Sequence, residues 1–255
     1  MVAIFQSKIP YDVSLERALP AISALDPAQW LIVDDAYVGQ MAERERLLST
    51  QRDVVIVLDE GARASAEELL SEVLKFLCTL AEFTIKQDHV TCPDGRYVRV
   101  DPSDPLATLG RLVQNDFCIL QKVDGEHVLT GAVLCFPASW SLSEKFMRPL
   151  SIIHELVKTY DDNITKRVQR LFDGIKSGHP LWRFNALNYA TPELFQPRSQ
   201  NDRRKIPQKN EARFFRSERQ TLIRLPKTGA VVFGIHTFIL KNIKIYIFQN
   251  TNGLY

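Results

Sequence analysis

The chain has 255 residues, of which 45% are hydrophobic and 24% charged, and its formal net charge is +2. This composition is that of a folded globular protein and excludes disorder and collagen-like repeats. No apolar run approaches the ~18 residues of a membrane-spanning helix. The N-terminus, MVAIFQSKIPYDV, lacks the basic start and apolar stretch of a signal peptide. We therefore expect a cytoplasmic protein with neither a membrane nor nucleic acid as partner.

The chain has four cysteines, at Cys78, Cys92, Cys118 and Cys135. None of them belongs to a CxxC pair, so the spacing indicates neither a zinc knuckle nor an iron–sulfur cluster. We expect reduced thiols with a structural role.

Residues 1–108 have a mainly helical pattern. Asp34 or Asp35 is a candidate cap for a helix containing MAERERLL. The segment SAEELLSEVLKFLCTLAEF predicts a second helix, with Ser65 and Glu68 as a capping box. The stretch TCPDGRYVRVDPSDP is broken by proline and glycine, which predicts a connector with one small hairpin. We expect this N-terminal region to pack on the rest of the chain.

Residues 109–240 begin with a predicted hairpin, because FCILQKV and HVLTGAVLCF flank Asp124-Gly125, a dipeptide suited to a tight turn. From Ile164 to Ile175 apolar residues then recur at intervals of 3 to 4, which predicts a helix with Asp161 or Asp162 as its N-terminal cap. Three further strands are predicted at LWRFNALNY, ARFFRSERQTLIRL and AVVFGIHTFIL. A turn at PKTG joins the last two.

The predicted order is thus two strands, a helical insert and three strands. Strands joined by short turns pair antiparallel, and the insert must cross one face of their sheet. This is the order that PAS domains use, which hold a cofactor between the insert and the inner face of the sheet. We therefore expect an α+β fold with a PAS-like antiparallel sheet.

Several peptides together resemble one family. They are PAQWLIVDDAY with AERERLL, LGRLVQNDFCIL, CFPASWSLSEKFMRPLSIIH, LWRFN and RSERQTLIRLPKTGAVVFGIHTF, in this order between about residues 9 and 240. They are similar to successive blocks of the haem-dependent oxidative N-demethylase α subunits and their fungal relatives. The blocks around FPASW and RSERQTLIRLPKTGAVVF are the most specific.

The resemblance implies a PAS-type domain that binds haem b and oxidises a small secondary amine such as dimethylamine with O2, in monooxygenase-like chemistry. The products would be formaldehyde and the demethylated amine, and tetrahydrofolate would take the one-carbon product. Electrons would come from NADPH through partner subunits that carry FMN and an iron–sulfur cluster. This sequence contains neither a glycine-rich dinucleotide fingerprint nor iron–sulfur cysteine spacing, so a separate reductase would be needed.

Two alternatives remain open. The first alternative to an N-demethylase is a haem-binding PAS sensor, although no output module is apparent. The second is a non-catalytic, degenerate member of the family that binds no haem. The segment 241–255, KNIKIYIFQNTNGLY, does not resemble the helical region with which relatives continue. We expect an atypical tail there, as a truncated gene product would have.

His154 is the candidate axial ligand of the haem iron, because PLSIIHELV places it within an apolar run of the insert. His89 and His127 have turn-like, polar surroundings, and His179 belongs to a loop. The family block has Pro-Val-Pro-like residues after Ile-His, whereas ELVK follows here. The alternative is that His154 is a core histidine whose hydrogen bonds are made within the protein.

His236 is the second histidine of interest. In AVVFGIHTFIL the period of two places it on one strand face with Val232, Gly234 and Phe238. A catalytic role there would be a hydrogen bond to bound oxygen or substrate, with Gly234 allowing close approach of a flat ligand. The alternative is a half-buried histidine of the sheet.

Polar residues on the last strands complete the candidate site. Arg183 and Asn185 share one face of LWRFN, and in RSERQTL Arg216 and Glu218 share a face opposite to Arg219. Arg183 or Arg216 could bind a haem propionate, and Glu218 could hold a protonated amine and take its proton. Glu218 and Arg219 are the catalytic candidates, and the sequence does not tell which face points inward. The alternative is a solvated strand with cross-strand ion pairs.

Overall fold

The computed structural model describes residues 3–14, 21–153, 162–199, 201–202, 207–208 and 211–241. Of residues 162–166 it describes the backbone only. His154 and residues 242–255, nearly all of the predicted tail, lie outside the described residues. No helix among the described residues is long and apolar enough to cross a membrane.

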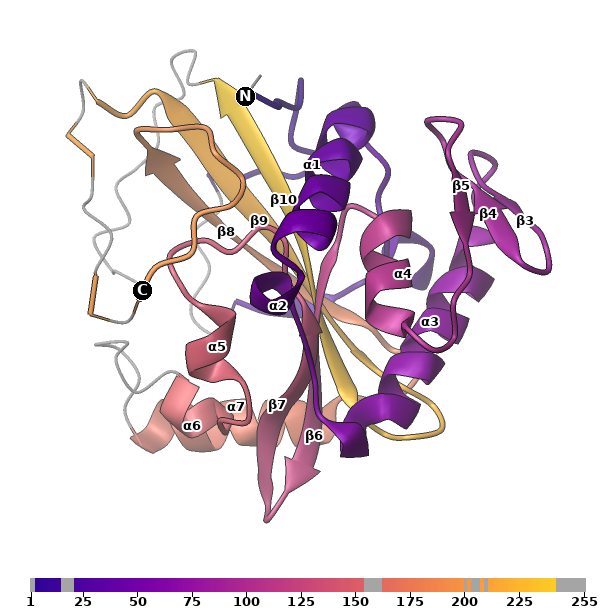
Figure 1. The fold of residues 1–255 in the computed structure, drawn as a ribbon. Coiled ribbons are helices and arrows are strands. Elements are labelled where there is room, and N and C mark those ends of the chain that lie inside the picture. The colour runs from indigo at the N-terminus through magenta and orange to yellow at the C-terminus, as the bar shows by residue number, and fades with distance from the viewer. Residues whose placement is uncertain are drawn as a thin grey trace.

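The centre of the fold is a seven-stranded sheet in the order β1-β8-β9-β10-β6-β7-β2, and every neighbouring pair is antiparallel (Figure 1). Its strands are β1 (Ser23–Ala24), β2 (Ile56–Leu58), β6 (Asp116–Val123), β7 (Glu126–Val133), β8 (Leu181–Tyr189), β9 (Phe214–Arg224) and β10 (Val231–Lys241). The expected α+β class with a large antiparallel sheet is confirmed.

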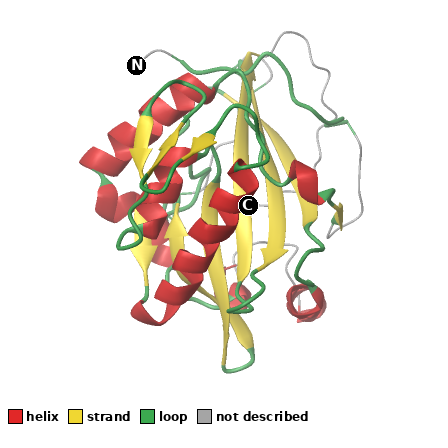
Figure 2. Ribbon diagram, turned by 90° about the vertical axis from the view of Figure 1, so that its right-hand side faces the viewer, coloured by secondary structure: helices red, strands yellow, loops and turns green. Residues whose placement is uncertain are grey.

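The second half of the chain supplies the five long strands. Strands β6 and β7 come first, three helices follow, and β8, β9 and β10 come last. The helices are α5 (Leu142–Lys145), α6 (Leu150–Ile153) and α7 (Asp162–Gly174). Figure 2 shows the long strands side by side, with the β6–β7 hairpin projecting at the bottom.

Both predicted turns are confirmed. Asp124 and Gly125 have φ of 50° and 88°, the left-handed pair that a two-residue hairpin turn needs. Gly229 has φ of 71° in the turn between β9 and β10. Only glycine, asparagine or aspartate adopt this region at low cost, so these residues fix the register of each hairpin.

The N-terminal region is mainly helical, as expected, but it also contributes both edge strands, β1 and β2. Its helices are η1 (Pro27–Gln29), α1 (Tyr37–Thr50), α2 (Arg52–Val55), η2 (Glu60–Ala62), α3 (Arg63–Leu77) and α4 (Pro105–Leu112). The predicted small hairpin is part of a three-stranded sheet of β3 (Thr84–Ile85), β4 (His89–Thr91) and β5 (Tyr97–Arg99). The two regions distinguished in the sequence therefore share one sheet.

The predicted capping box at Ser65 and Glu68 is wrong, because α3 already begins at Arg63 and continues directly from η2. The chain is capped earlier, where Asp59 accepts a hydrogen bond from Gly61 N. Glu68 instead reaches the β9–β10 turn and accepts hydrogen bonds from Lys227 N and Thr228 N at 2.6 and 2.8 Å. Burial opposes the charged form of Glu68, but these hydrogen bonds outweigh it and lower its pKa.

Two hydrophobic cores lie on opposite faces of the sheet (Figure 1). We call the face under α5–α7 the insert face; Cys118, Leu120 and Ile235 belong to its core. We call the other the N-terminal face, because its core joins Phe117 and Val232 to residues of α1, α3 and α4. Successive residues of each strand point to alternate faces, so every polar residue of β8, β9 and β10 can be assigned to one of them.

Candidate functional site

The insert face carries a group of polar residues beside its apolar core. Glu218 lies between Asn185 on β8 and Thr237 on β10, with Arg216 and Gln220 two residues away on either side. Arg216 and Glu218 are only 2% and 5% exposed. Buried charges are costly unless they are paired and hydrogen-bonded, so this group is an unusual feature of the sheet.

Glu218 is held in place by its neighbours. Its Oε2 accepts hydrogen bonds from Asn185 Nδ2 at 3.0 Å and Gln220 Nε2 at 3.2 Å, and Oε1 lies 3.4 Å from Arg216 Nη2. Asn185 Oδ1 in turn accepts a bond from Glu218 N. An ionised carboxylate has about four lone-pair positions, so these three donors leave it capacity for one more.

Arg216 is fixed by main-chain carbonyls. Nη1 donates to Leu194 O at 3.0 Å and Nη2 to Phe136 O at 2.6 Å, and the guanidinium lies over the Tyr189 ring, 5.9 Å from its centroid. Its buried Nε has no hydrogen-bond partner in the described part of the chain. The Nε–H of Arg216 is therefore available to a ligand.

The Phe136 peptide links Arg216 to a fully buried ion pair. Asp116 accepts hydrogen bonds from Cys135 N at 2.7 Å and Phe136 N at 2.8 Å. Its partner is Arg44 of α1, whose Nη1 lies 2.6 Å from Asp116 Oδ1. The main chain of Phe136 is thus held at its N–H by Asp116 and at its carbonyl by Arg216, so the ion pair positions Arg216 and, through it, Glu218.

The sequence does not predict this ion pair, because Arg44 lies in MAERERLL, a helix segment in which half of the residues are charged. A signal was present: Arg44 is three residues from both Met41 and Leu47, and all three are fully buried on one side of α1. A charged residue within an apolar stripe indicates a buried partner.

Lys145 was also missed, because a lysine at the end of a short helix is usually solvated. Its Nζ lies over the Trp140 ring, 4.4 Å from the centroid, and Trp140 packs against the core of the insert face. No hydrogen bond joins Nζ to an acceptor among the described residues. Burial lowers the pKa of Lys145 to about 8, although Cys118, Glu144 and Glu218 act in the opposite direction.

The segment that carries Trp140 and Lys145 is bounded by unusual backbone conformations. Ser139 and Met147 have φ of 66° and 58°, the left-handed region that residues other than glycine rarely adopt. Such conformations persist only where the surroundings impose them, and they are frequent at functional sites. Here they direct α5 against the insert face.

Arg183 shares the insert face with Asn185 and lies opposite Gln220 across β8 and β9. The structure therefore brings Arg183, Arg216 and Glu218 onto one face, together with Lys145. Two other predicted residues, His236 and Arg219, lie on the opposite one.

His236 is fully buried on the N-terminal face. Its Nε2 lies 2.9 Å from Asp34 Oδ2 and its Nδ1 3.4 Å from Asn115 Oδ1. Burial opposes ionisation of Asp34, but the hydrogen bond with His236 and others outweigh it and keep the Asp34 pKa low. A Cβ at Gly234 would meet Thr221 Oγ1 at 2.7 Å, so this glycine makes room for a neighbouring strand.

Arg219 also serves the N-terminal face. It donates to Trp30 O at 3.1 Å and to Gln29 O, and its guanidinium lies over the Trp182 ring. Burial lowers its pKa to about 10. Arg219 thus ties the end of η1 to the sheet.

The predicted axial ligand, His154, lies outside the described residues, so its position remains a prediction. Of the other candidates, His127 is on the insert face near the β6–β7 turn, with Nδ1 3.0 Å from Gln169 Oε1. His89 lies on β4 in the small sheet, and its Nδ1 is 2.8 Å from Asp88 Oδ1.

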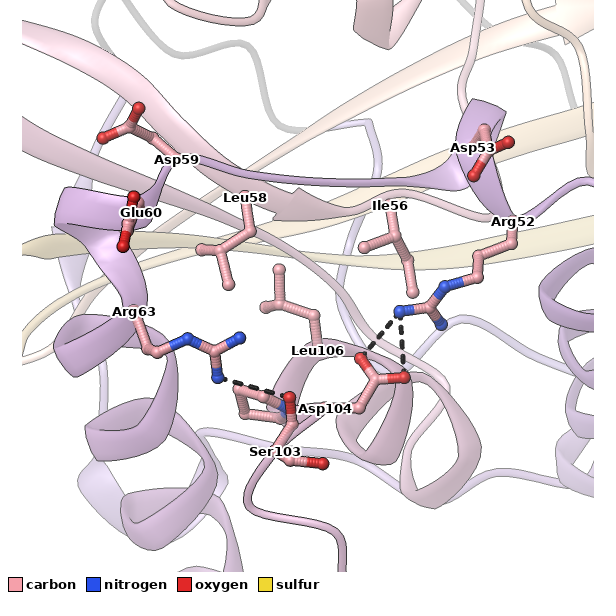
Figure 3. Close-up of a pocket in the computed structure, with 11 residues that line it drawn as sticks. Arg52, Asp53, Ile56, Leu58, Asp59, Glu60, Arg63, Ser103, Asp104 and Leu106 are labelled. Atoms are coloured by element: carbon pink, nitrogen blue, oxygen red, sulfur yellow. Dashed lines mark hydrogen bonds and ion pairs between the residues drawn. The ribbon is translucent and has the colours of Figure 1, made fainter.

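A separate cavity of about 610 Å³ lies beside the edge strand β2 (Figure 3). Arg52 forms an ion pair with Asp104 at 2.9 Å, and Arg63 donates to Ser103 O at 3.2 Å. Figure 3 shows these pairs on either side of Leu106. The charged groups that line this cavity are partly or fully exposed to solvent, so it lacks the buried, partly satisfied groups of the insert face.

Residues 21–246 match the sequence model of a family described as haem-dependent oxidative N-demethylase, alpha subunit-like. The match spans most of the chain, including every strand of the large sheet. The chain belongs to this family. The family's description indicates haem dependence and the role of one subunit in a system of several components.

Proposed function

We propose that this protein binds haem b on the insert face and catalyses oxidative N-demethylation of a small, dimethylamine-like secondary amine with O2. The observation that carries the proposal is the buried polar group around Glu218, set within the apolar insert face of a chain from a haem-dependent family. A buried carboxylate with spare acceptor capacity suits an ammonium ligand.

The strand order supports a PAS-like placement of the cofactor. Strands β7-β6-β10-β9-β8 are adjacent in this order, and α5–α7 connect β7 to β8 across one face. PAS domains have the same order and hold their cofactor between the connecting helices and the sheet. The proposal therefore places haem under α5–α7.

The residues of the insert face fit a haem. Cys118, Leu120 and Ile235 offer an apolar surface to a porphyrin. Arg216 Nε and Thr237 Oγ1 are buried donors without hydrogen-bond partners in the described part of the chain, and they suit propionate oxygens. We propose Arg183 and Arg216 as propionate ligands and His154 as the axial ligand. When bound, the haem supplies the activation of oxygen.

The chain's own residues bind and orient the amine. Glu218 would accept hydrogen bonds from the substrate ammonium and draw it to a fixed position, while Asn185, Gln220 and Arg216 hold the carboxylate. His236 and Arg219 act from the N-terminal face, so we assign them to positioning the sheet and not to contact with substrate.

A separate NADPH-dependent reductase with FMN and an iron–sulfur cluster would supply the electrons. The proposal rests on the absence of both binding motifs from the sequence and on the family's description as an alpha subunit.

Formaldehyde release tests the proposed reaction. Haem-loaded protein given a chemical reductant, O2 and dimethylamine should release formaldehyde in proportion to amine consumed, and omission of O2 should abolish it. A haem-loaded protein that releases none under these conditions would instead be a sensor or a non-catalytic member of the family.

A further inference from the structure

Besides Arg216, whose guanidinium is paired with Glu218, the insert face contains a further cation, Lys145. Lys145 Nζ occupies the face of the Trp140 ring at 4.4 Å, on the same side of the sheet as Glu218. Aromatic faces and carboxylates are the groups that bind alkylammonium ions, and the insert face carries both, Trp140 and Glu218. Lys145 therefore stands in the position that suits the ligand proposed above.

Two positive charges are unfavourable in one partly buried site. At short range and low effective dielectric constant they repel each other strongly, and Glu218, which already lies 3.4 Å from the Arg216 guanidinium, compensates at most one of them. An alkylammonium can therefore bind tightly only if Lys145 is neutral. Because no hydrogen bond to an acceptor holds its ammonium among the described residues, Lys145 can release its proton more easily than a paired lysine.

We propose that Lys145 is a further catalytic residue, whose neutral amine accepts the proton of an alkylammonium held at Glu218. This inference rests on the proposed function. In the step, one N–H bond of the substrate ammonium breaks, its electron pair remains on the substrate nitrogen, and a new N–H bond forms at Lys145 Nζ. The substrate is then a neutral amine, which is the form that can be oxidised, and the total charge of the site is unchanged.

The surroundings of Lys145 are consistent with this exchange. Three titratable groups act on Lys145 directly: Glu144 on its own helix, Cys118 on β6 and Glu218 on β9. The other charged groups of this region are Arg183 and Arg216, on the same face as Glu218, and Arg52 and Asp53 on α2. Burial raises the pKa of Cys118 to about 12, so this thiol stays neutral. Arg52 and Asp53 are exposed to solvent. With a pKa of about 8, Lys145 is the group that titrates in the neutral range.

Binding of tetramethylammonium, a cation that cannot lose a proton, tests the inference in the full-length protein. Calorimetric titrations between about pH 6.5 and 9.5 should show affinity rising about tenfold per pH unit below pH 8 and levelling off above it. Lys145→Met should abolish the rise and bind about 30-fold more tightly than wild type at pH 6.5. Lys145→Arg, always charged, should bind weakly throughout.

The matched control is Lys75→Met, since Lys75 is exposed on α3 and paired only with Glu72; its profile should equal that of wild type. An equal pH slope in wild type and Lys145→Met would overturn the role of Lys145 and leave the proposed function intact. A slope that depends on Lys145, in a protein that forms no formaldehyde, would support Lys145 and overturn only the proposed function. Absence of cation binding in every variant would refute both.

Discussion

Replacing Asp116 with alanine should lower the free energy of unfolding by about 3–5 kcal/mol. The change leaves the Arg44 guanidinium, which is 0% exposed, without its counterion, and it removes the acceptor for Cys135 N and Phe136 N. Uncompensated buried charge and unpaired amides both destabilise a fold. Equilibrium unfolding in urea measures the difference.

Asp173→Ala is the matched control, because Asp173 pairs with Lys122 at 2.7 Å but both side chains are about half exposed. Surface ion pairs contribute at most about 1 kcal/mol. A loss below 1 kcal/mol for Asp116→Ala would mean that the ion pair does not hold this part of the fold.

Glu218→Gln should lower kcat/KM for the secondary amine by about 100-fold or more. The substitution keeps the shape of the side chain but removes the charge that pairs with the ammonium. In wild type, Asn185 Nδ2 and Gln220 Nε2 both donate to Glu218 Oε2. A glutamine has only one oxygen acceptor for these two donors, and its amide nitrogen takes the place of the second carboxylate oxygen. Steady-state formaldehyde release at several amine concentrations separates the effects on KM and kcat.

Glu193→Gln serves as control for Glu218, since Glu193 is exposed on the loop after β8. Loss of the Glu218 charge also removes the partner of the buried Arg216, so the unfolding curve of Glu218→Gln is measured as well, and the kinetics are compared under conditions in which the variant is folded. Unchanged kinetics in Glu218→Gln would show that the amine binds elsewhere.

Much of the sheet could be predicted from the sequence because its determinants are local. Apolar segments around a turn indicate β6 and β7, period-two alternation indicates faces on β8 to β10, and Asp124-Gly125 and Gly229 supply the positive φ that hairpin turns require. The edge strands could not be predicted. Strands β1 and β2 have two and three residues, too few for a pattern, and they form only because distant strands offer free edges.

The sequence also predicts that Glu218 and Arg219 lie on opposite faces of their strand, but it does not tell which of them faces the insert. A strand buried on both sides carries polar residues on both, and the period of two defines the sets without orienting them. Long-range contacts decide the orientation. Arg219 binds the carbonyls of Gln29 and Trp30, about 190 residues away, and this directs Glu218 to the insert face.

Lys145 and Asp116 show a second limit. Each lies in a short segment whose local pattern is ordinary, and each acquires its properties from residues that are distant in sequence: Cys118 and Glu218 near Lys145, and Arg44 beside Asp116. Burial of a charge is a property of the folded chain, so it becomes visible only when the packing is known.

Haem uptake by the purified protein is the direct test of the proposed cofactor site on the insert face. Titration with hemin should produce a Soret band that saturates at one haem per chain, and His154→Ala should weaken or shift the band. The control His89→Ala, in the small sheet remote from the insert face, should leave it unchanged. A chain that stays colourless with excess hemin would contradict the proposed site.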